Sequence, residues 1–319
     1  MIYKNLYIIG NGFDQYHDIP CGFPFFMNWV KEHDVALFIR LIQEYEHAWD
    51  PEWWSDFENS LARLNFSIYA NIKGNLFDPE YINDGSIDEK TDYASRKVIE
   101  EFSAIKESLR MSFQKWLFEA YGKLNIDKKI PLQGEDSVFL SFNYTRTLED
   151  IYGIKPEQIF HIHGIIDDLD SMIVGHGLGL TELNDILERQ KPRVLGEVIN
   201  KKFNLMTRLQ LVTPRDKELA TASALESIYS LKKDIDGCIK NNIQFFDVIL
   251  DVKRIFVYGF SFSSIYMPYL EKIIRRTKPE THWVISWYSQ DDKRRIMDFV
   301  IRYDIHNITM IHGIQNIDI

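Results

Sequence analysis

The sequence predicts an α/β protein with a doubly wound, mostly parallel sheet and large helical insertions. Short apolar strands alternate with helices along much of the chain, which is the pattern of a parallel sheet covered on both faces. Several of these strands end in glycine or polar residues. Two stretches, at about 25–124 and 178–250, have helical periodicity instead. We therefore expect a single domain over 1–319, with these two stretches inserted into the strand series.

The first predicted strand, at 3–9, runs directly into Gly10-Asn11-Gly12-Phe13-Asp14. A buried strand, a glycine turn and a helix in this order are typical of nucleotide-binding proteins. Gly10 permits backbone torsions closed to other residues, and Gly12 lets a phosphate approach the main chain, where helix N–H groups would hold it. Gln15 stands where a dehydrogenase has its third glycine, so a dehydrogenase is not indicated. An ordinary strand-to-helix turn is the alternative reading.

The first helical stretch contains three separate signals. Asp50-Pro51-Glu52 predicts a helix start, with Asp50 as N-cap and Pro51 in the first turn. Residues 75–93 are polar and predict an irregular loop. The clearest amphipathic helix of the chain carries an apolar face of Val98, Phe102, Ile105, Leu109, Phe113 and Trp116.

Six further strands complete the predicted sheet. They lie at 137–142, 158–164, 171–177, 253–258, 283–287 and 308–311. Helices are expected through Leu148 and Ile151, through Leu270 and Ile274, and over 294–301. Because parallel strands need crossover connections, this alternation favours a parallel sheet.

Composition excludes several classes of protein. A net charge of −10 and a pI near 5.4 argue against broad nucleic-acid binding through a basic surface. The two cysteines, Cys21 and Cys238, cannot form a disulfide framework or a four-cysteine zinc site. The N-terminus does not have the pattern of a signal peptide, and no apolar run approaches transmembrane length. We expect a cytoplasmic protein without a membrane partner.

Four strand ends carry the chemistry: Gly-Asn-Gly-Phe-Asp, Phe-Asn-Tyr-Thr, His-Ile-His-Gly and Gly-Phe-Ser-Phe. In an open α/β sheet, ligands bind outside the carboxyl ends of the strands. We therefore expect Gly10, Asn143, His163 and Gly259 to line one crevice despite their separation in sequence. We expect His163 to be presented to that crevice, and His161 to be a hydrogen-bonded interior residue.

These motifs resemble those of the sirtuin-like NAD-binding superfamily. Its glycine-rich opening is similar to residues 10–14, its Asn-Tyr-Asp element to Asn143-Tyr144-Thr145, its His-Gly to His163-Gly164, and its Gly-Thr-Ser-Leu to Gly259-Phe260-Ser261-Phe262. More closely still, the chain resembles the bacterial abortive-infection AbiH family. That resemblance also includes Trp54-Ser55-Asp56-Phe57-Glu58, Glu149 and Gly175-His176.

The resemblance implies a Rossmann-like domain that binds NAD and an antiphage protein that hydrolyses it to ADP-ribose and nicotinamide. It assigns catalysis to Asn143, which would orient water or a ribose hydroxyl, and to His163, which would take the proton. The implied nucleotide-binding residues are Gly10, Asn11, Gly12, Phe13, Asp14, Thr145, Gly259 and Ser261.

Two departures from the sirtuin pattern bear on this implication. Thr145 stands where sirtuins have the aspartate that contacts nicotinamide. Asp14 replaces a serine and would repel phosphates unless it is protonated or turned toward a ribose.

Two other functions stay open. One is a nucleotide-binding sensor that signals through its helical insertions. The other is a metal-dependent nuclease that uses His161, His163 and His176 as ligands. Glu58 and Glu149 could reach the crevice, but a helix-surface role is the commoner one for either residue. Besides the nucleotide, the expected partners are a phage-derived trigger or a second defence protein, and a homo-oligomer is compatible with the sequence.

Overall fold

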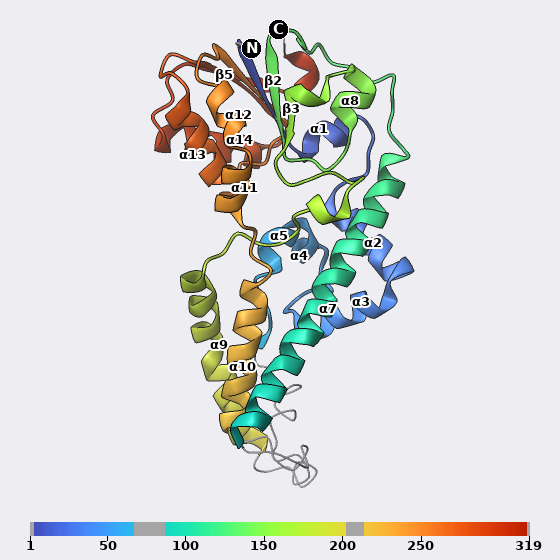
Figure 1. Ribbon diagram of the computed structural model, residues 1–319, viewed down its shortest axis with the longest axis vertical. Helices are drawn as coiled ribbons and strands as arrows, with labels where there is room; N and C mark the ends of the chain where they lie inside the picture. The colour runs from blue at the N-terminus through green and yellow to red at the C-terminus, as the bar shows by residue number, and fades with distance from the viewer. Residues whose placement is uncertain (1–2, 67–86, 202–213, 318–319) are drawn as a thin grey trace. The chain divides into compact units, whose positions relative to one another are not determined.

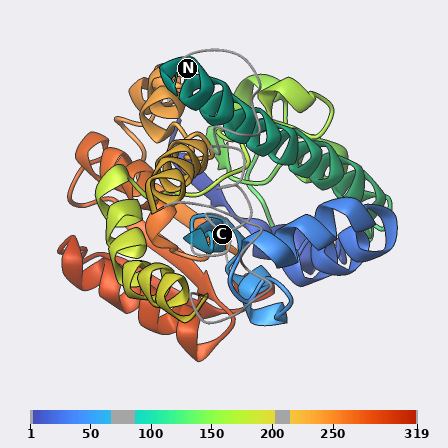
Figure 2. The same cartoon turned by 90° about the horizontal axis from the view of Figure 1, so that it is seen from below.

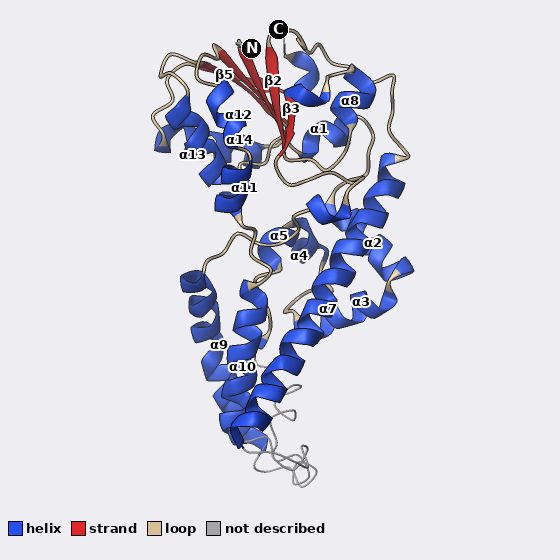
Figure 3. Ribbon diagram, viewed as in Figure 1, coloured by secondary structure: helices blue, strands red, loops and turns tan. Residues whose placement is uncertain are grey.

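The computed structural model describes residues 3–66, 87–201 and 214–317, and the chain divides into two compact units. Unit 1 consists of Met1–Phe25, Phe113–Ile173 and Asp234–Ile319. Unit 2 consists of Phe26–Ser112 and Val174–Lys233. Within the described ranges, the strands form one sheet in unit 1 and the remaining regular structure is helical, as Figure 3 shows. The predicted α/β class is confirmed.

The sheet of unit 1 has six strands in the order β3-β2-β1-β4-β5-β6, and every neighbouring pair is parallel. The strands are β1 (Asn5–Ile9), β2 (Ser137–Ser141), β3 (Ile159–His161), β4 (Arg254–Tyr258), β5 (His282–Trp287) and β6 (Ile308–His312). Ile9 pairs with Ser141 on one side and Tyr258 on the other. The loops that follow β1, β2 and β4 therefore leave the sheet at the same level.

Burial on both faces explains why the strands read as continuous apolar runs. Leu6 and Ile8 pack on one face, in a cluster with residues of α11 (Ile235–Asn241), α12 (Ile243–Val248), α13 (Met267–Arg276) and α14 (Gln290–Arg302). Tyr7 and Ile9 pack on the other face, with Phe13 of α1 (Asn11–Tyr16) and Leu148 of α8 (Thr147–Tyr152). Figure 1 shows these two sets of helices on opposite sides of the sheet.

The predicted strand at 171–177 is wrong. A short 3₁₀ turn, η4 (Leu169–Ser171), precedes an extended connection in which the Ile173 N–H donates to the His163 carbonyl over 2.9 Å. The apolar run Met172-Ile173-Val174 is too short to add a ladder to the sheet, and it crosses from unit 1 into unit 2. The described residues also contain the 3₁₀ turns η3 (Pro156–Gln158), η6 (Ser264–Tyr266) and η7 (Ile314–Asn316).

The regular structure described in unit 2 is helical. Its described helices are α2 (Phe23–His33), α3 (Val35–Glu44), α4 (Pro51–Ser55), α5 (Phe57–Ser60), α7 (Ile87–Tyr121), α9 (Leu180–Lys201) and α10 (Pro214–Tyr229). Helix α2 begins in unit 1, and α7 enters unit 1 at Phe113. Helices α9 and α10 pack on each other (Figures 1 and 2).

The sequence signals in the first helical stretch are largely confirmed. Asp50 caps α4, since its Oδ1 accepts from the Glu52 N–H over 2.9 Å. The predicted apolar face of α7, from Val98 to Trp116, is buried. The loop expected at 75–93 is wrong for 87–93, which are helical, and its other residues lie outside the described ranges. None of the described helices combines the length and apolar content needed to cross a membrane.

Candidate functional site

The turn after β1 packs backbone to backbone against the turn after β4. The Gly10 N–H donates to the Tyr258 carbonyl over 3.0 Å, and the Gly12 N–H to the Gly259 carbonyl over 2.8 Å. Gly259 has a φ of +61°, and a Cβ there would lie 2.2 Å from the Phe13 nitrogen. The glycines are therefore required for the close approach of two main chains.

Asp14 is the central polar residue of this region, and only 2% of it is exposed. The Thr145 hydroxyl donates to its Oδ2 over 2.6 Å, and the Thr147 hydroxyl to its Oδ1 over 2.8 Å. Burial raises the pKa of Asp14 to about 6, although hydrogen bonds from Thr145, Thr147 and Asn143 and the nearby His161 act in the opposite direction. A carboxyl group with this pKa changes charge just below neutral pH.

Asn143 ties the ends of β1 and β2 together. Its side-chain amide donates to the Gly10 carbonyl over 3.0 Å, and its own N–H is bonded to the Ser141 hydroxyl over 3.2 Å. The structure thus brings Gly10, Asn143 and Gly259 together with Asp14 at the carboxyl ends of β1, β2 and β4.

His161 and Glu149 form a second polar pair beside Asp14. The His161 Nε2 lies 3.0 Å from the Glu149 Oε1, and its Nδ1 lies 3.3 Å from the Asn143 carbonyl. A neutral imidazole donates to only one of these oxygens, which leaves its other ring nitrogen as an acceptor. The side chains are 14% and 13% exposed, so the expectation of a helix-surface Glu149 is wrong. The Glu149 Oε2 is buried and has no hydrogen-bond partner among the described residues.

His163 lies on the other side of the sheet from His161. It is 1% exposed, its Nε2 is 3.2 Å from the Tyr269 hydroxyl, and its ring packs against Phe142 and Tyr266. The expectation that His163 is presented to the crevice is therefore wrong. Strand β3 ends at His161, so the alternation of side chains does not carry both histidines to one face.

The other predicted binding residues differ in exposure. Asn11 and Ser261 are exposed, and the Asn11 amide donates to the Cys21 carbonyl over 3.1 Å. Phe13 is fully buried and packs against His17 and Tyr258. Phe13 therefore belongs to the core of unit 1.

Thr147 and Glu149 were not predicted as site residues. The usable signal was a threonine pair, Thr145 and Thr147, after a buried strand. With two hydroxyls at that strand end, a carboxylate on the neighbouring strand end has donors for both of its oxygens.

His176 and Glu58 have structural partners within unit 2. The His176 Nε2 lies 2.9 Å from the Ile228 carbonyl, and its Nδ1 accepts from the Leu178 N–H over 3.2 Å. Glu58 forms an ion pair with the fully buried Lys233, so the helix-surface expectation for Glu58 is also wrong. The described part of the chain holds no group of three histidine, cysteine or carboxylate side chains arranged for a metal ion.

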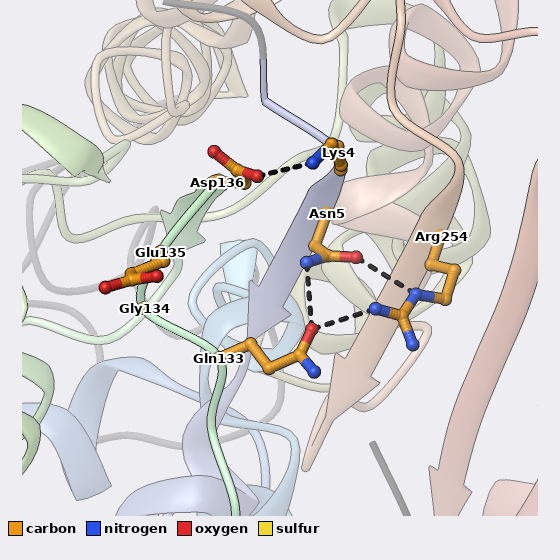
Figure 4. Close-up of a pocket in the computed structure, with 7 residues that line it drawn as sticks. All are labelled: Lys4, Asn5, Gln133, Gly134, Glu135, Asp136 and Arg254. Atoms are coloured by element: carbon orange, nitrogen blue, oxygen red, sulfur yellow. Dashed lines mark hydrogen bonds and ion pairs between the residues drawn. The ribbon is translucent and has the colours of Figure 1, made fainter.

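A polar depression of about 530 Å³ lies at the opposite edge of the sheet, at the amino ends of β1 and β4 (Figure 4). Its lining residues are Lys4, Asn5, Gln133, Gly134, Glu135, Asp136 and Arg254. Arg254 donates to the Asn5 Oδ1 over 3.0 Å and to the Gln133 Oε1 over 2.8 Å. These groups bond to one another, and ligands of open α/β sheets bind at the carboxyl edge. We therefore place the candidate site at the Asp14 end.

Comparison with known proteins matches the chain to a protein family. Neither the curated proteins nor the solved structures contain a match to this chain. The model of the family described as "Bacteriophage abortive infection AbiH" matches residues 6–287. That range includes the Asp14, Asn143, Glu149 and His161 positions, and it covers most of the chain. The protein therefore belongs to the bacteriophage abortive infection AbiH family.

Proposed function

We propose that this abortive-infection protein hydrolyses the N-glycosidic bond of a nucleotide, with NAD as the substrate that yields ADP-ribose and nicotinamide. The observation that carries the proposal is Asp14, a buried carboxyl group with a pKa of about 6 among Thr145, Thr147 and Asn143. It lies at the carboxyl end of β1, where an open α/β sheet binds its ligand.

Asp14 supplies negative charge to the reaction. Cleavage of the bond from ribose to base leaves positive charge on the sugar in the transition state. With a pKa of about 6, Asp14 is mostly ionised at neutral pH. The hydroxyl donors hold the carboxylate in position, so it stabilises that positive charge without rearranging. The attraction is strong because the dielectric around a buried group is low.

In this proposal His161 accepts a proton and Glu149 binds the ribose. Both side chains reach solvent, so His161 can accept a proton from the attacking water. The buried Oε2 of Glu149 has no hydrogen-bond partner among the described residues, and the proposal assigns it as the acceptor for a ribose hydroxyl. In this proposal Asn143 positions Asp14 and the β1 turn, and His163 supports the site from the buried side.

The strand order supports a Rossmann-like, sirtuin-like assignment. The order β3-β2-β1-β4-β5-β6 is that of dinucleotide-binding doubly wound sheets, which bind their ligand where the order reverses, between β1 and β4. Gly10, Asp14, Gly259 and Ser261 are at or close to that position. In this proposal the ribose of the scissile nucleoside lies beside Asp14, whose two oxygens accept from Thr145 and Thr147.

A nucleotide-binding sensor is the second candidate. The N–H groups of Gly10, Gly12 and Phe13 already donate to carbonyl groups of the protein. A phosphate at this turn would bind through fewer main-chain donors than a typical glycine loop provides. Weak phosphate contacts fit a protein that senses a nucleotide at high concentration.

Incubation of the purified protein with NAD, followed by measurement of free nicotinamide, tests the proposal. The wild type should release nicotinamide, and its rate should fall as the pH drops below about 6, because Asp14 becomes protonated. Asp14→Asn should lower the rate roughly 10²–10³-fold, and His161→Ala roughly 10²–10⁴-fold.

His306→Ala is the matched control for this assay. His306 is an exposed histidine that also faces a carboxylate, Asp304, over 3.2 Å. Its variant should keep the wild-type rate. A wild type that binds NAD and releases no nicotinamide would support the sensor in place of the hydrolase.

A further inference from the structure

An exposed aromatic stack stands at the carboxyl ends of β5 and β6. Tyr288 is 84% exposed, and its ring lies nearly parallel to that of His312, with 6.3 Å between the ring centres. The Trp287 ring is tilted by 51° to the same histidine ring, with 4.5 Å between the ring centres. The Lys293 amine sits 5.0 Å from the centre of the Trp287 ring. The stack of Trp287, Tyr288 and His312 belongs entirely to unit 1.

The sheet and the first turn of α14 hold these rings in place. Trp287 and His312 are paired neighbours in the β5–β6 ladder, and the Gly313 N–H donates to the Trp287 carbonyl over 2.9 Å. The His312 Nε2 lies 3.3 Å from the Tyr288 carbonyl. Folding thus orders the stack and still leaves the Tyr288 ring in water. Large exposed aromatic side chains on an ordered framework are typical of binding surfaces.

We propose that this stack binds the second base of a dinucleotide whose scissile nucleoside lies at Asp14. The inference rests on the proposed function. All six strands are parallel, so the stack and Asp14 share the carboxyl edge of the sheet.

The distance between Asp14 and the stack along the carboxyl edge of the sheet indicates that the ligand is a dinucleotide. Two strand intervals separate β1, which leads to Asp14, from β5, which leads to Tyr288. At about 4.8 Å per interval this is roughly 10 Å. The base released by cleavage is bonded directly to the ribose, so it cannot reach that far. A base on the stack must therefore belong to a second nucleoside.

The positive charge of Lys293 next to the stack suits the phosphates that join the two nucleosides of such a ligand. Among the described residues, Lys293 makes no ion pair, whereas Arg294 and Arg295 are paired with Asp291 and Asp292. The positive charge of Lys293 is therefore open to a phosphate. A flat π-face beside a cation binds bases with little regard to their identity.

Calorimetric titration with ADP-ribose, AMP and nicotinamide mononucleotide tests the proposal. Stacking on an aromatic residue contributes about 1–3 kcal/mol per base, which is about 5- to 140-fold in affinity. Tyr288→Ala should weaken ADP-ribose and AMP by that factor, and Tyr288→Phe should bind as the wild type does. Trp49→Ala, which removes an exposed aromatic residue of unit 2, is the matched control and should have no effect.

Nicotinamide mononucleotide separates this proposal from the hydrolase. It carries the scissile bond and no second base, so its cleavage should be equal in the wild type and in Tyr288→Ala. If Tyr288→Ala loses affinity for adenine nucleotides and the wild type cleaves no substrate, the base-binding role of the stack is supported and the hydrolase proposal is contradicted. Equal affinity of the wild type and Tyr288→Ala for ADP-ribose would overturn the stack, as would a wild type that binds no adenine nucleotide.

Discussion

Asp14 lowers the free energy of unfolding of the protein at neutral pH. Its pKa is about 6 in the folded chain, against 3.8 for an ordinary aspartate. Between these values the folded protein binds more protons than the unfolded chain, so stability falls as the pH rises from about 4 to about 6. The difference corresponds to roughly 3 kcal/mol at 1.36 kcal/mol per pKa unit. Retaining so costly a carboxylate is typical of functional sites.

Asp14→Asn should remove this pH dependence. The amide is close in shape, and its oxygen can still accept from one of the two threonine hydroxyls. Urea unfolding at pH 4, 5, 6 and 7 should give the variant a flatter stability profile than the wild type over this interval. Parallel profiles for the two proteins would mean that Asp14 is ionised throughout and that its pKa is not raised.

The two histidines near the end of β3 should respond differently to truncation. His163 is enclosed by rings, so His163→Ala should lower the free energy of unfolding by roughly 2–4 kcal/mol. It should spare turnover in the folded fraction. His161→Ala should leave stability nearly unchanged and lower the rate.

Thermal melts measured together with nicotinamide release distinguish these effects. The sequence motif assigns the proton transfer to His163, whereas the geometry favours His161. A fully folded His163→Ala protein without activity would restore the assignment made from the motif.

At the scale of elements, the contact of the β1 and β4 turns holds the sheet together where its strand order reverses. Gly259→Ala should destabilise the protein strongly, because the new Cβ meets the main chain of Gly12 and Phe13 and no flexible side chain. We expect a loss of roughly 1–3 kcal/mol from this overlap, in addition to the left-handed strain.

Gly153→Ala is the control for that strain. Gly153 has a φ of +63°, close to that of Gly259, and a Cβ there meets nothing within 4 Å. Its variant should lose only about 1–2 kcal/mol. Equal melting temperatures for the two variants would show that the turn contact adjusts easily to a side chain.

Strands that are buried on both faces could be predicted from the sequence, because burial on both faces requires a continuous run of apolar residues. Residues 137–142 are apolar enough to be a strand in any α/β context, and β2 is there. Residues 171–177 have a similar composition, but Ile173 bonds to His163 and His176 pairs with Lys232 in unit 2. A short apolar run does not specify its partner, so tertiary contacts decided this case.

The candidate site was predictable only as an approximate position. Parallel strands bring their carboxyl ends together, which placed Gly10, Asn143 and Gly259 at one edge. The role of Asp14 depends on Thr145 and Thr147, which are 131 and 133 residues away in sequence. Which of the two histidines, His161 or His163, lies beside Asp14 depends on the residue at which β3 ends. Neither property is encoded by local periodicity.

At the scale of the molecule, the two segments of unit 2 depend on each other. The Phe66 N–H donates to the Gln190 side chain over 2.9 Å, Lys106 donates to the Ser230 carbonyl over 2.7 Å, and Glu58 pairs with Lys233. Each of these contacts joins Phe26–Ser112 to Val174–Lys233.

A protein made of residues 174–233 alone should therefore be unfolded, and so should one made of 26–112. When the two are mixed or linked, they should regain helical circular dichroism and a cooperative thermal transition. Cooperative melting of either segment alone would contradict this interdependence. Whether 1–319 behaves as a single domain is tested separately by limited proteolysis of the full chain.

The position of β1 inside the sheet also sets the order of events during synthesis. Asn5 of β1 bonds to Arg254 of β4, 249 residues later. At about 5–20 residues per second, a nascent β1 waits roughly 12–50 s on the ribosome for that neighbour. The glycine contact beside Asp14 cannot close before then. The site beside Asp14 is therefore incomplete until the turn that follows β4 has been synthesised.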